Sequence, residues 1–224
     1  MYKVLRTITD SFSLRELLRV STPQNHLYYD LGAITKAITR PETVALMESG
    51  QLYGDYGHNV RERGLKATGS LRLPEYDEIK DPDGSIRRVK VIPACRTVSI
   101  SLDDDVITHQ QEILDTPAGR LVNALEESGA GGWSWACFGH APAGRAMVRF
   151  FEGLDYVLQP NFLSLSRKAE LPADMLSKAS RATPEKAVKF SEHALILEDA
   201  GRTNTRIAMP TGYRFAPQKV RYFG

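Results

Sequence analysis

Ser134 stands in the stretch GAGGWSWACFG, between Trp133 and Trp135 and close behind several glycines. A serine hydroxyl is a weak nucleophile until a neighbouring base takes its proton. Tight backbone whose amide N–H groups can face a developing oxyanion is a common setting for a catalytic serine, and this glycine-rich approach offers it. The alternative is a small residue of a buried strand, bonded to backbone. The stretch has no G-x-S-x-G pattern, so it does not indicate the nucleophile elbow of the α/β-hydrolases.

The candidate bases are the five histidines: His26, His58, His109, His140 and His193. A lone histidine is more often a satisfied surface or core group than a base. His58 follows a glycine and stands three residues after Asp55, which predicts a turn whose side chains can point into a cleft. His109 shares an expected strand face with Ile107 and Ile113, so a buried structural role is expected. His140 has no assured contact with Ser134, and His193 falls in an expected tail helix.

The candidate acid is Asp155, which lies among apolar residues in FEGLDYVLQP. Burying an unpaired carboxylate is costly, so this side chain must be paired or hydrogen-bonded. Orienting an imidazole would satisfy it, and so would an Asx turn or a cap after Gly153. The run Asp103–Asp105 predicts a turn between strands. Such a triplet is usually a solvated loop, although it could bind a cation.

Composition indicates an ordinary globular protein. The chain has 224 residues, enough for one substantial core or one domain with an appendage. Its net charge of +2 is too small to indicate binding to nucleic acid or to a membrane. No apolar run approaches the roughly 20 residues that span a bilayer, and no secretory signal is expected. Cys95 and Cys137 indicate neither a disulfide framework nor a zinc site, which favours a reducing compartment. No cofactor is expected.

The hydrophobic pattern predicts a mainly β core with one well-marked helix packed on it, an α+β fold. The turn signal DPDGS predicts a hairpin. Strands are expected in YKVLRTIT, YDEIK, IRRVKVIPA, RTVSIS, DVITHQQEIL, WSWACF and RAMVRFF.

Two helices are expected before residue 170. One spans about Pro41–Ser49 and is closed by Gly50. The other begins at Pro117, after possible caps at Asp115 and Thr116. It carries an apolar face formed by Leu121, Val122 and Leu125.

The character of the chain changes after about Glu170. Two further helices are expected at 173–180 and 184–200, followed by a stretch with little periodicity. The expected organisation is therefore a domain over residues 1–170 and a helical tail or appendage over residues 171–224.

An ordered series of segments resembles the prohead (capsid maturation) proteases of tailed bacteriophages. It begins with GDYGHNV and the paired strands RTVSISLDDDVITHQQEIL. ILDTPAGRLVNALEESG is similar to the family's segment in which T-x-x-G-[KR] precedes an amphipathic helix. GGWSWACFG takes the place of the glycine-hydrophobic-serine strand, and FEGLDYVLQPNFLSLS resembles the aspartate-containing segment. The series covers residues 50–166 in the expected order.

The resemblance implies a fold related to the herpesvirus assemblins, a β-barrel surrounded by helices. It implies a serine endopeptidase that works inside the immature capsid, in the host cytoplasm, and cleaves scaffolding protein, major capsid protein and often itself. Position by position, Ser134 matches the nucleophile and His58 the general base. Asp155 matches the third-member segment, where assemblins use a second histidine. A homo-oligomer, a dimer or larger, is also implied, with no nucleic acid and no membrane as partner.

Some positions depart from the family pattern. Asn59 stands where a proline often follows the histidine. Trp135 stands where a serine or small residue often follows the nucleophile, and it could narrow the cleft or pack inward. Assemblins use an arginine region after the third member to help hold the oxyanion. Arg167 matches that region only by rough position.

The sequence leaves two rival functions open. One is a structural or scaffolding protein of the phage head that keeps the fold without activity. Such a protein would not need serine, histidine and acid together at matching places. The other is a metal-assisted hydrolase that uses Asp103–Asp105 and His109.

Overall fold

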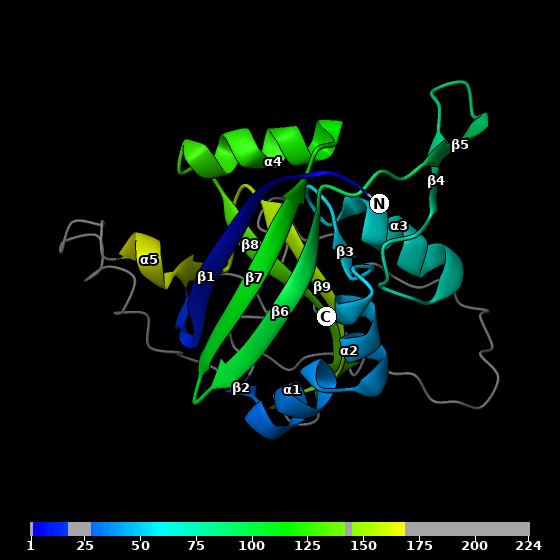
Figure 1. Ribbon diagram of the computed structural model, residues 1–224. Coiled ribbons are helices and arrows are strands. Elements are labelled where there is room, and N and C mark those ends of the chain that lie inside the picture. The colour runs from blue at the N-terminus through cyan, green and yellow to red at the C-terminus, as the bar shows by residue number, and fades with distance from the viewer. Residues whose placement is uncertain (1, 18–27, 142–144, 169–224) are drawn as a thin grey trace.

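The computed structural model describes residues 2–17, 28–141 and 145–168, which form a mixed α+β fold built mostly from strands. A curled sheet makes half of a barrel, and a second sheet packs behind it (Figure 1). The expected α+β class is confirmed at this level.

The curled sheet has five strands in the order β10-β1-β7-β6-β3, with each pair antiparallel. The alternation of buried and half-exposed residues along a strand is what a sheet with one buried face requires. Along β7, every second residue from Ile107 to Ile113 is buried, and the residues between them are half-exposed. The acidic run forms the turn between β6 and β7, as expected. The strands are β1 (Val4–Leu17), β3 (Tyr53–Gly54), β6 (Cys95–Asp103), β7 (Val106–Leu114) and β10 (Phe162–Ser164).

The second sheet has the order β2-β9-β8 and contains the serine strand. Its strands are β2 (Tyr28–Tyr29), β8 (Gly132–His140) and β9 (Arg145–Val157). Strands β8 and β9 run antiparallel. Every residue of β8 from Gly132 to Gly139 is buried, which matches the buried strand expected from the apolar run.

The helices are α1 (Leu31–Ile38), α2 (Pro41–Glu48), α3 (Asn59–Thr68), α4 (Pro117–Glu127) and α5 (Leu165–Lys168). Helices α2 and α4 confirm the two predicted ones, and the Thr116 hydroxyl caps α4 by accepting from the Gly119 N–H. Leu121 was expected on the buried face of α4. It is 45% exposed, whereas Val122 is fully buried and Leu125 packs against the core.

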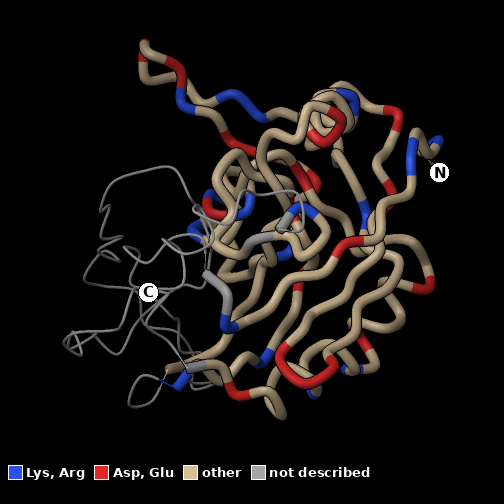
Figure 2. Tube along the Cα trace, turned by 90° about the vertical axis from the view of Figure 1, so that its left-hand side faces the viewer, with Lys and Arg blue, Asp and Glu red and all other residues tan. Residues whose placement is uncertain are grey.

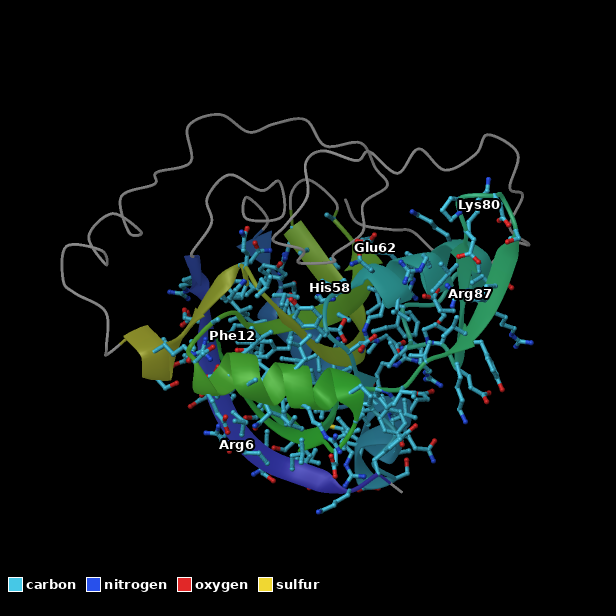
Figure 3. The ribbon with its side chains drawn as sticks, turned by 90° about the horizontal axis from the view of Figure 1, so that it is seen from above. Arg6, Phe12, His58, Glu62, Lys80 and Arg87 are labelled. Atoms are coloured by element: carbon cyan, nitrogen blue, oxygen red, sulfur yellow. The ribbon has the colours of Figure 1, made fainter. Side chains whose placement is uncertain are left out.

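The predicted hairpin is present as β4 (Tyr76–Lys80) and β5 (Ile86–Lys90). It projects from the body and carries acidic and basic residues (Figure 2). Gly84 has a φ of +88° in its turn, a backbone conformation that favours glycine. Lys80 and Arg87 lie out on this hairpin, whereas His58 lies in the interior of the fold (Figure 3).

Aromatic side chains fill the space between the two sheets. Trp135 is fully buried, and its ring lies 5.9 Å from Phe12 and 5.4 Å from Tyr29. Of the two orientations left open for Trp135, the inward one is therefore observed. Cys95 and Cys137 are not joined in a disulfide, and both are buried.

The expected tail helices at 173–180 and 184–200 and the expected domain boundary at 170/171 lie outside the described residues, as do His26 and His193. No helix in the part of the chain that the structure describes is long and apolar enough to cross a membrane.

Candidate functional site

Strand pairing places two of the candidate residues side by side. Ser134 on β8 is the direct partner of Asp155 on β9. Paired residues of an antiparallel ladder project on the same face, and neighbours along a strand project on opposite faces. The two tryptophans that flank Ser134 are in the core between the sheets. The serine hydroxyl and the Asp155 carboxylate therefore share the other face.

A short loop after β3 brings in the histidine. The loop runs along the end of β9: the Tyr156 N–H donates to the Asp55 carbonyl, and the Gly57 N–H donates to the Tyr156 carbonyl. Gly57 has a φ of +75°, which suits glycine at the turn into α3. His58 is the residue that precedes the first turn of α3.

His58 joins the serine to the aspartate. Its Nε2 lies 3.0 Å from the Ser134 Oγ, and its Nδ1 lies 2.6 Å from the Asp155 Oδ2. An ionised carboxylate can only accept, so the ring carries its proton on Nδ1, and Nε2 accepts from the serine hydroxyl. Ser134 and His58 are each 1% exposed, and Asp155 is fully buried.

The Asp155 carboxylate is held on both oxygens. Its Oδ1 accepts the Asp55 N–H at 2.8 Å, and its Oδ2 accepts the Arg61 Nε–H at 2.7 Å as well as the His58 ring. Burial opposes the charged form, but the charge of Arg61 and the hydrogen bond from His58 outweigh it, so the pKa of Asp155 lies below its ordinary value. The carboxylate is therefore ionised at neutral pH.

Arg61 was not singled out by the sequence. It is fully buried, and besides Asp155 it donates to the carbonyl oxygens of Leu71, Glu152 and Tyr53. The available signal was spacing: on a helix, Arg61 lies three residues after His58 and thus near its face. That signal required α3 to be predicted, and it was not.

Asp55 places a second buried carboxyl beside the site. Burial raises the pKa of Asp55 to about 6, the N–H of Tyr56 opposes this, and the charge of Asp155 adds to it. The backbone of the same residue donates to Asp155. Asp55 therefore contributes an N–H to the site and a carboxyl group that changes charge near neutral pH.

Gly54 allows the loop to approach β9 closely. A Cβ at this position would lie 1.9 Å from the Leu154 carbonyl oxygen and 2.8 Å from the Cys95 sulfur. Only a residue without a side chain fits there. Gly54 thus allows the loop that carries His58 to lie close to β9, the strand that carries Asp155.

The other candidate residues are not part of this group. His109 is fully buried between the rings of Phe12 and Trp133, as its strand face predicted. In the turn of the acidic run, Asp105 accepts from Ser13 and pairs with Arg15. No cluster of three or more metal-ligating side chains occurs among the described residues.

Arg167 lies beside the start of β8. It donates to the Gly131 carbonyl at 2.5 Å, pairs with the Glu126 carboxylate at 2.5 Å and lies 3.3 Å from the Tyr156 hydroxyl. Its guanidinium thus links helix α4 to the residue that precedes β8. The suggested role at the oxyanion stays a prediction.

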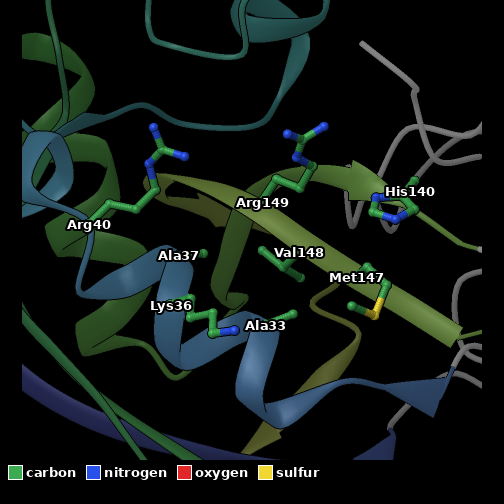
Figure 4. A pocket seen from close by; sticks show the side chains of 8 residues that line it. All are labelled: Ala33, Lys36, Ala37, Arg40, His140, Met147, Val148 and Arg149. Atoms are coloured by element: carbon green, nitrogen blue, oxygen red, sulfur yellow. The ribbon is translucent and has the colours of Figure 1, made fainter. Parts of the chain in front are cut away.

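His140 lies at the far end of β8 from Gly132. It lines a separate hollow of about 240 Å³ between α1 and β9, together with apolar side chains such as Val148 and basic ones such as Lys36 and Arg149 (Figure 4). None of the three predicted catalytic side chains lines this hollow.

The group built by Ser134, His58 and Asp155 can carry out acyl transfer. The hydroxyl has a base within hydrogen-bonding distance, and an ionised acid orients that base. Comparisons with known proteins add nothing to this assignment: no family model, curated protein or solved structure matches the chain. The function is therefore inferred from the geometry of the site and from the resemblance of the sequence segments.

Proposed function

We propose that this protein is a serine endopeptidase of the prohead-maturation kind, with Ser134 as nucleophile, His58 as general base and Asp155 as the residue that orients the base. The observation that carries the proposal is the unbroken chain of hydrogen bonds from the Ser134 hydroxyl through the His58 ring to Asp155. A serine in a purely structural role needs only one acceptor, and it does not need a base held by a buried carboxylate.

The reaction is acyl transfer in two halves. His58 takes the Ser134 proton as the oxygen attacks the scissile carbonyl, and backbone N–H groups hold the oxyanion. His58 then protonates the leaving amine, and the acyl-enzyme is hydrolysed when the ring activates a water molecule in the same way. Asp155 keeps the ring in the required tautomer throughout.

The proposed substrates are the scaffolding and major capsid proteins of an immature phage head, and the chain itself. This part of the proposal, with the assemblin-like fold, the location inside the prohead and a homo-oligomeric state, is supported by the order of the resembling segments. The curled half-barrel sheet is compatible with it. Because Ser134 is buried in this conformation, we expect a peptide substrate to reach it only after a local opening of the site, which also admits a small reagent in the purified protein.

The first test is chemical and needs no known substrate. Diisopropyl fluorophosphate should label wild-type protein at Ser134, which mass spectrometry of the digested protein locates, and Ser134→Ala should not be labelled. Ser13→Ala is the matched control, because Ser13 is a buried serine that donates to the Asp105 carboxylate and, among the described residues, to no histidine. Labelling that is equal in Ser134→Ala would refute the assignment.

The second test concerns the substrates. Wild-type protein and Ser134→Ala are incubated with the capsid and scaffolding proteins encoded beside it, and fragments are read by mass. Fragments that appear only with wild-type protein and persist in a chelator support a serine peptidase. Fragments lost on chelation would favour a metal-assisted hydrolase. A folded wild-type protein that neither reacts with the fluorophosphate nor cleaves would favour the inactive structural protein.

A further inference from the structure

Arg61 is a fully buried charged side chain at the site, and each of its three guanidinium nitrogens donates a hydrogen bond. Its Nε donates to the Asp155 Oδ2 at 2.7 Å. Its Nη1 donates to the carbonyls of Leu71 at 2.8 Å and Glu152 at 3.0 Å, and its Nη2 to that of Tyr53 at 2.7 Å. A guanidinium presents donors in a fixed plane, so these four acceptors define its position closely.

These contacts join the parts of the fold that meet at the site. Arg61 lies on α3, directly after the histidine loop, while its acceptors lie on β3, on β9 and in the segment after α3. The Asp155 Oδ2 accepts from Arg61 and from the His58 Nδ1 at once. A displacement of the guanidinium would therefore displace the oxygen that orients the imidazole.

The same contact sets the charge of the site. A buried carboxylate without a cation tends to take up a proton, because burial disfavours the charged form. A protonated Asp155 would lose one of its acceptor sites. The charge of Arg61 compensates that of Asp155, so the carboxylate stays ionised within a buried and nearly neutral pair.

We propose that Arg61 is a positioning residue of the site, which keeps Asp155 ionised and oriented so that the carboxylate can hold His58. The inference rests on the proposed function. Arg61 becomes a fourth member of the chain of hydrogen bonds from serine through histidine to aspartate. It acts on the histidine only through Asp155. The inference also predicts a distinctive pH effect: without the guanidinium, a net negative charge stays beside the imidazole, and protonated forms of the Asp155–His58 pair are favoured.

The test measures the rate of Ser134 labelling by diisopropyl fluorophosphate across pH. In Arg61→Met we expect a rate at the plateau that is lower by about 10²-fold, because a small misplacement of a catalytic group costs this much. The acid limb of the profile should move to higher pH by about 1–2 units, as expected when a buried opposite charge is lost. Arg61→Lys keeps the charge without the planar fork, so it should lower the rate with a smaller shift of the acid limb.

Arg63→Met is the matched control, because Arg63 lies on the same helix and binds the Asp77 carboxylate through two nitrogens. Its rate and acid limb should equal those of wild-type protein. A folded Arg61→Met with the wild-type rate and the wild-type acid limb would overturn the inference and leave the proposed function standing. Failure of wild-type protein to label faster than Ser134→Ala would refute the proposed function itself.

Loss of a buried guanidinium could also unfold the chain, so a measurement on wild-type protein completes the test. The ¹³C signal of the Asp155 carboxyl is followed by NMR through an acid titration, together with the Arg61 Nε–H signal. The chemical shifts of both signals should change together, in one step, at a pH below the ordinary aspartate pKa of 3.8. A carboxyl group that titrates at or above that value, or an Arg61 signal that ignores the titration, would overturn the inference.

Discussion

Ser134 and Asp155 occupy directly opposed positions on neighbouring antiparallel strands, β8 and β9. This pairing fixes the nucleophile and the acid relative to each other through the backbone ladder, which is stiffer than a pair of loops. Only His58 comes from elsewhere in the chain, and two backbone hydrogen bonds tie its loop to Tyr156, the residue after Asp155. The position of the nucleophile relative to the acid is therefore as rigid as the sheet that carries both.

Asp155→Asn should lower the rate of Ser134 labelling by about 10²–10⁴-fold, because the amide can favour the wrong tautomer of His58. The loss should be smaller than the complete loss in Ser134→Ala. Unfolding followed by circular dichroism should also show lower stability, because Arg61 loses its buried counter-charge. Asp105→Asn, which changes an acid at the β6–β7 turn, serves as the control. A folded Asp155→Asn that labels like wild-type protein would exclude Asp155 from the site.

Gly54→Ala should destabilise the fold by more than about 2 kcal/mol, the range of overpacking in a close-packed interior. The added Cβ would lie 1.9 Å from the Leu154 carbonyl oxygen, a backbone atom held in β9. Urea denaturation measures the change. Gly32→Ala is the control: its Cβ meets only the Asp30 side chain, at 3.3 Å, and alanine favours a helix by about 1 kcal/mol over glycine. Equal stability of the two variants would contradict the close approach.

Local pattern accounts for the parts of the fold that the sequence predicts well. Alternation in β7 and the apolar run of β8 mark strands because burial of one face or both needs no distant information. Thr116 and Pro117 predict the start of helix α4, because threonine is a favoured N-cap and proline is favoured at the first helical position. The β4–β5 hairpin follows from its turn residues in the same way.

The missed elements depend on distant contacts. Helix α3 has no side-chain cap and is rich in charged residues, so its pattern is weak, and Arg61 and Leu65 become buried only once β9 and the following segment are in place. Helix α1 was detectable, since Asp30 caps it and Ile34 and Ile38 repeat at helical spacing. The contact between His58 and Ser134 lay beyond local pattern altogether. It was expected only from the resemblance.

Asp55→Asn should change how stability depends on pH. The folded-state pKa of Asp55 is about 6, above its ordinary value of 3.8. The folded protein thus binds its proton more tightly than the unfolded chain, and this stabilisation is lost as pH rises through 6. The unfolding free energy of Asp55→Asn relative to wild-type protein should increase from pH 4 to pH 7.5 by on the order of 2 kcal/mol.

Asp83→Asn provides the control of opposite sign for that experiment. Hydrogen bonds from Ser85 lower the pKa of Asp83 on the exposed hairpin turn. Its stabilisation is present above the ordinary aspartate pKa and lost in acid. The free energy of unfolding of Asp83→Asn should therefore be slightly lower than that of wild-type protein at neutral pH and equal to it at low pH. If Asp55→Asn followed the same trend as Asp83→Asn, Asp55 would not be a buried acid with a raised pKa.

His109→Leu should protect the fold against acid. Burial lowers the pKa of His109 from 6.5 to about 3, so the folded protein binds fewer protons here than the unfolded chain between those values. The stability that comes with the neutral ring is complete above 6.5 and is lost as pH falls towards 3. Leucine does not titrate, so its stability relative to wild-type protein should rise by about 2–3 kcal/mol between pH 7 and pH 4.5.

Ile113→Val is the control that separates this titration from a change in packing. Ile113 is an inward residue of the same strand, is also fully buried and carries no ionisable group. Its stability relative to wild-type protein should differ by the same amount at pH 7 and pH 4.5, because neither side chain changes charge. Urea denaturation at both pH values measures the two differences. A relative stability of His109→Leu that stays constant with pH would mean that this histidine takes up a proton in the folded state as readily as in the unfolded chain.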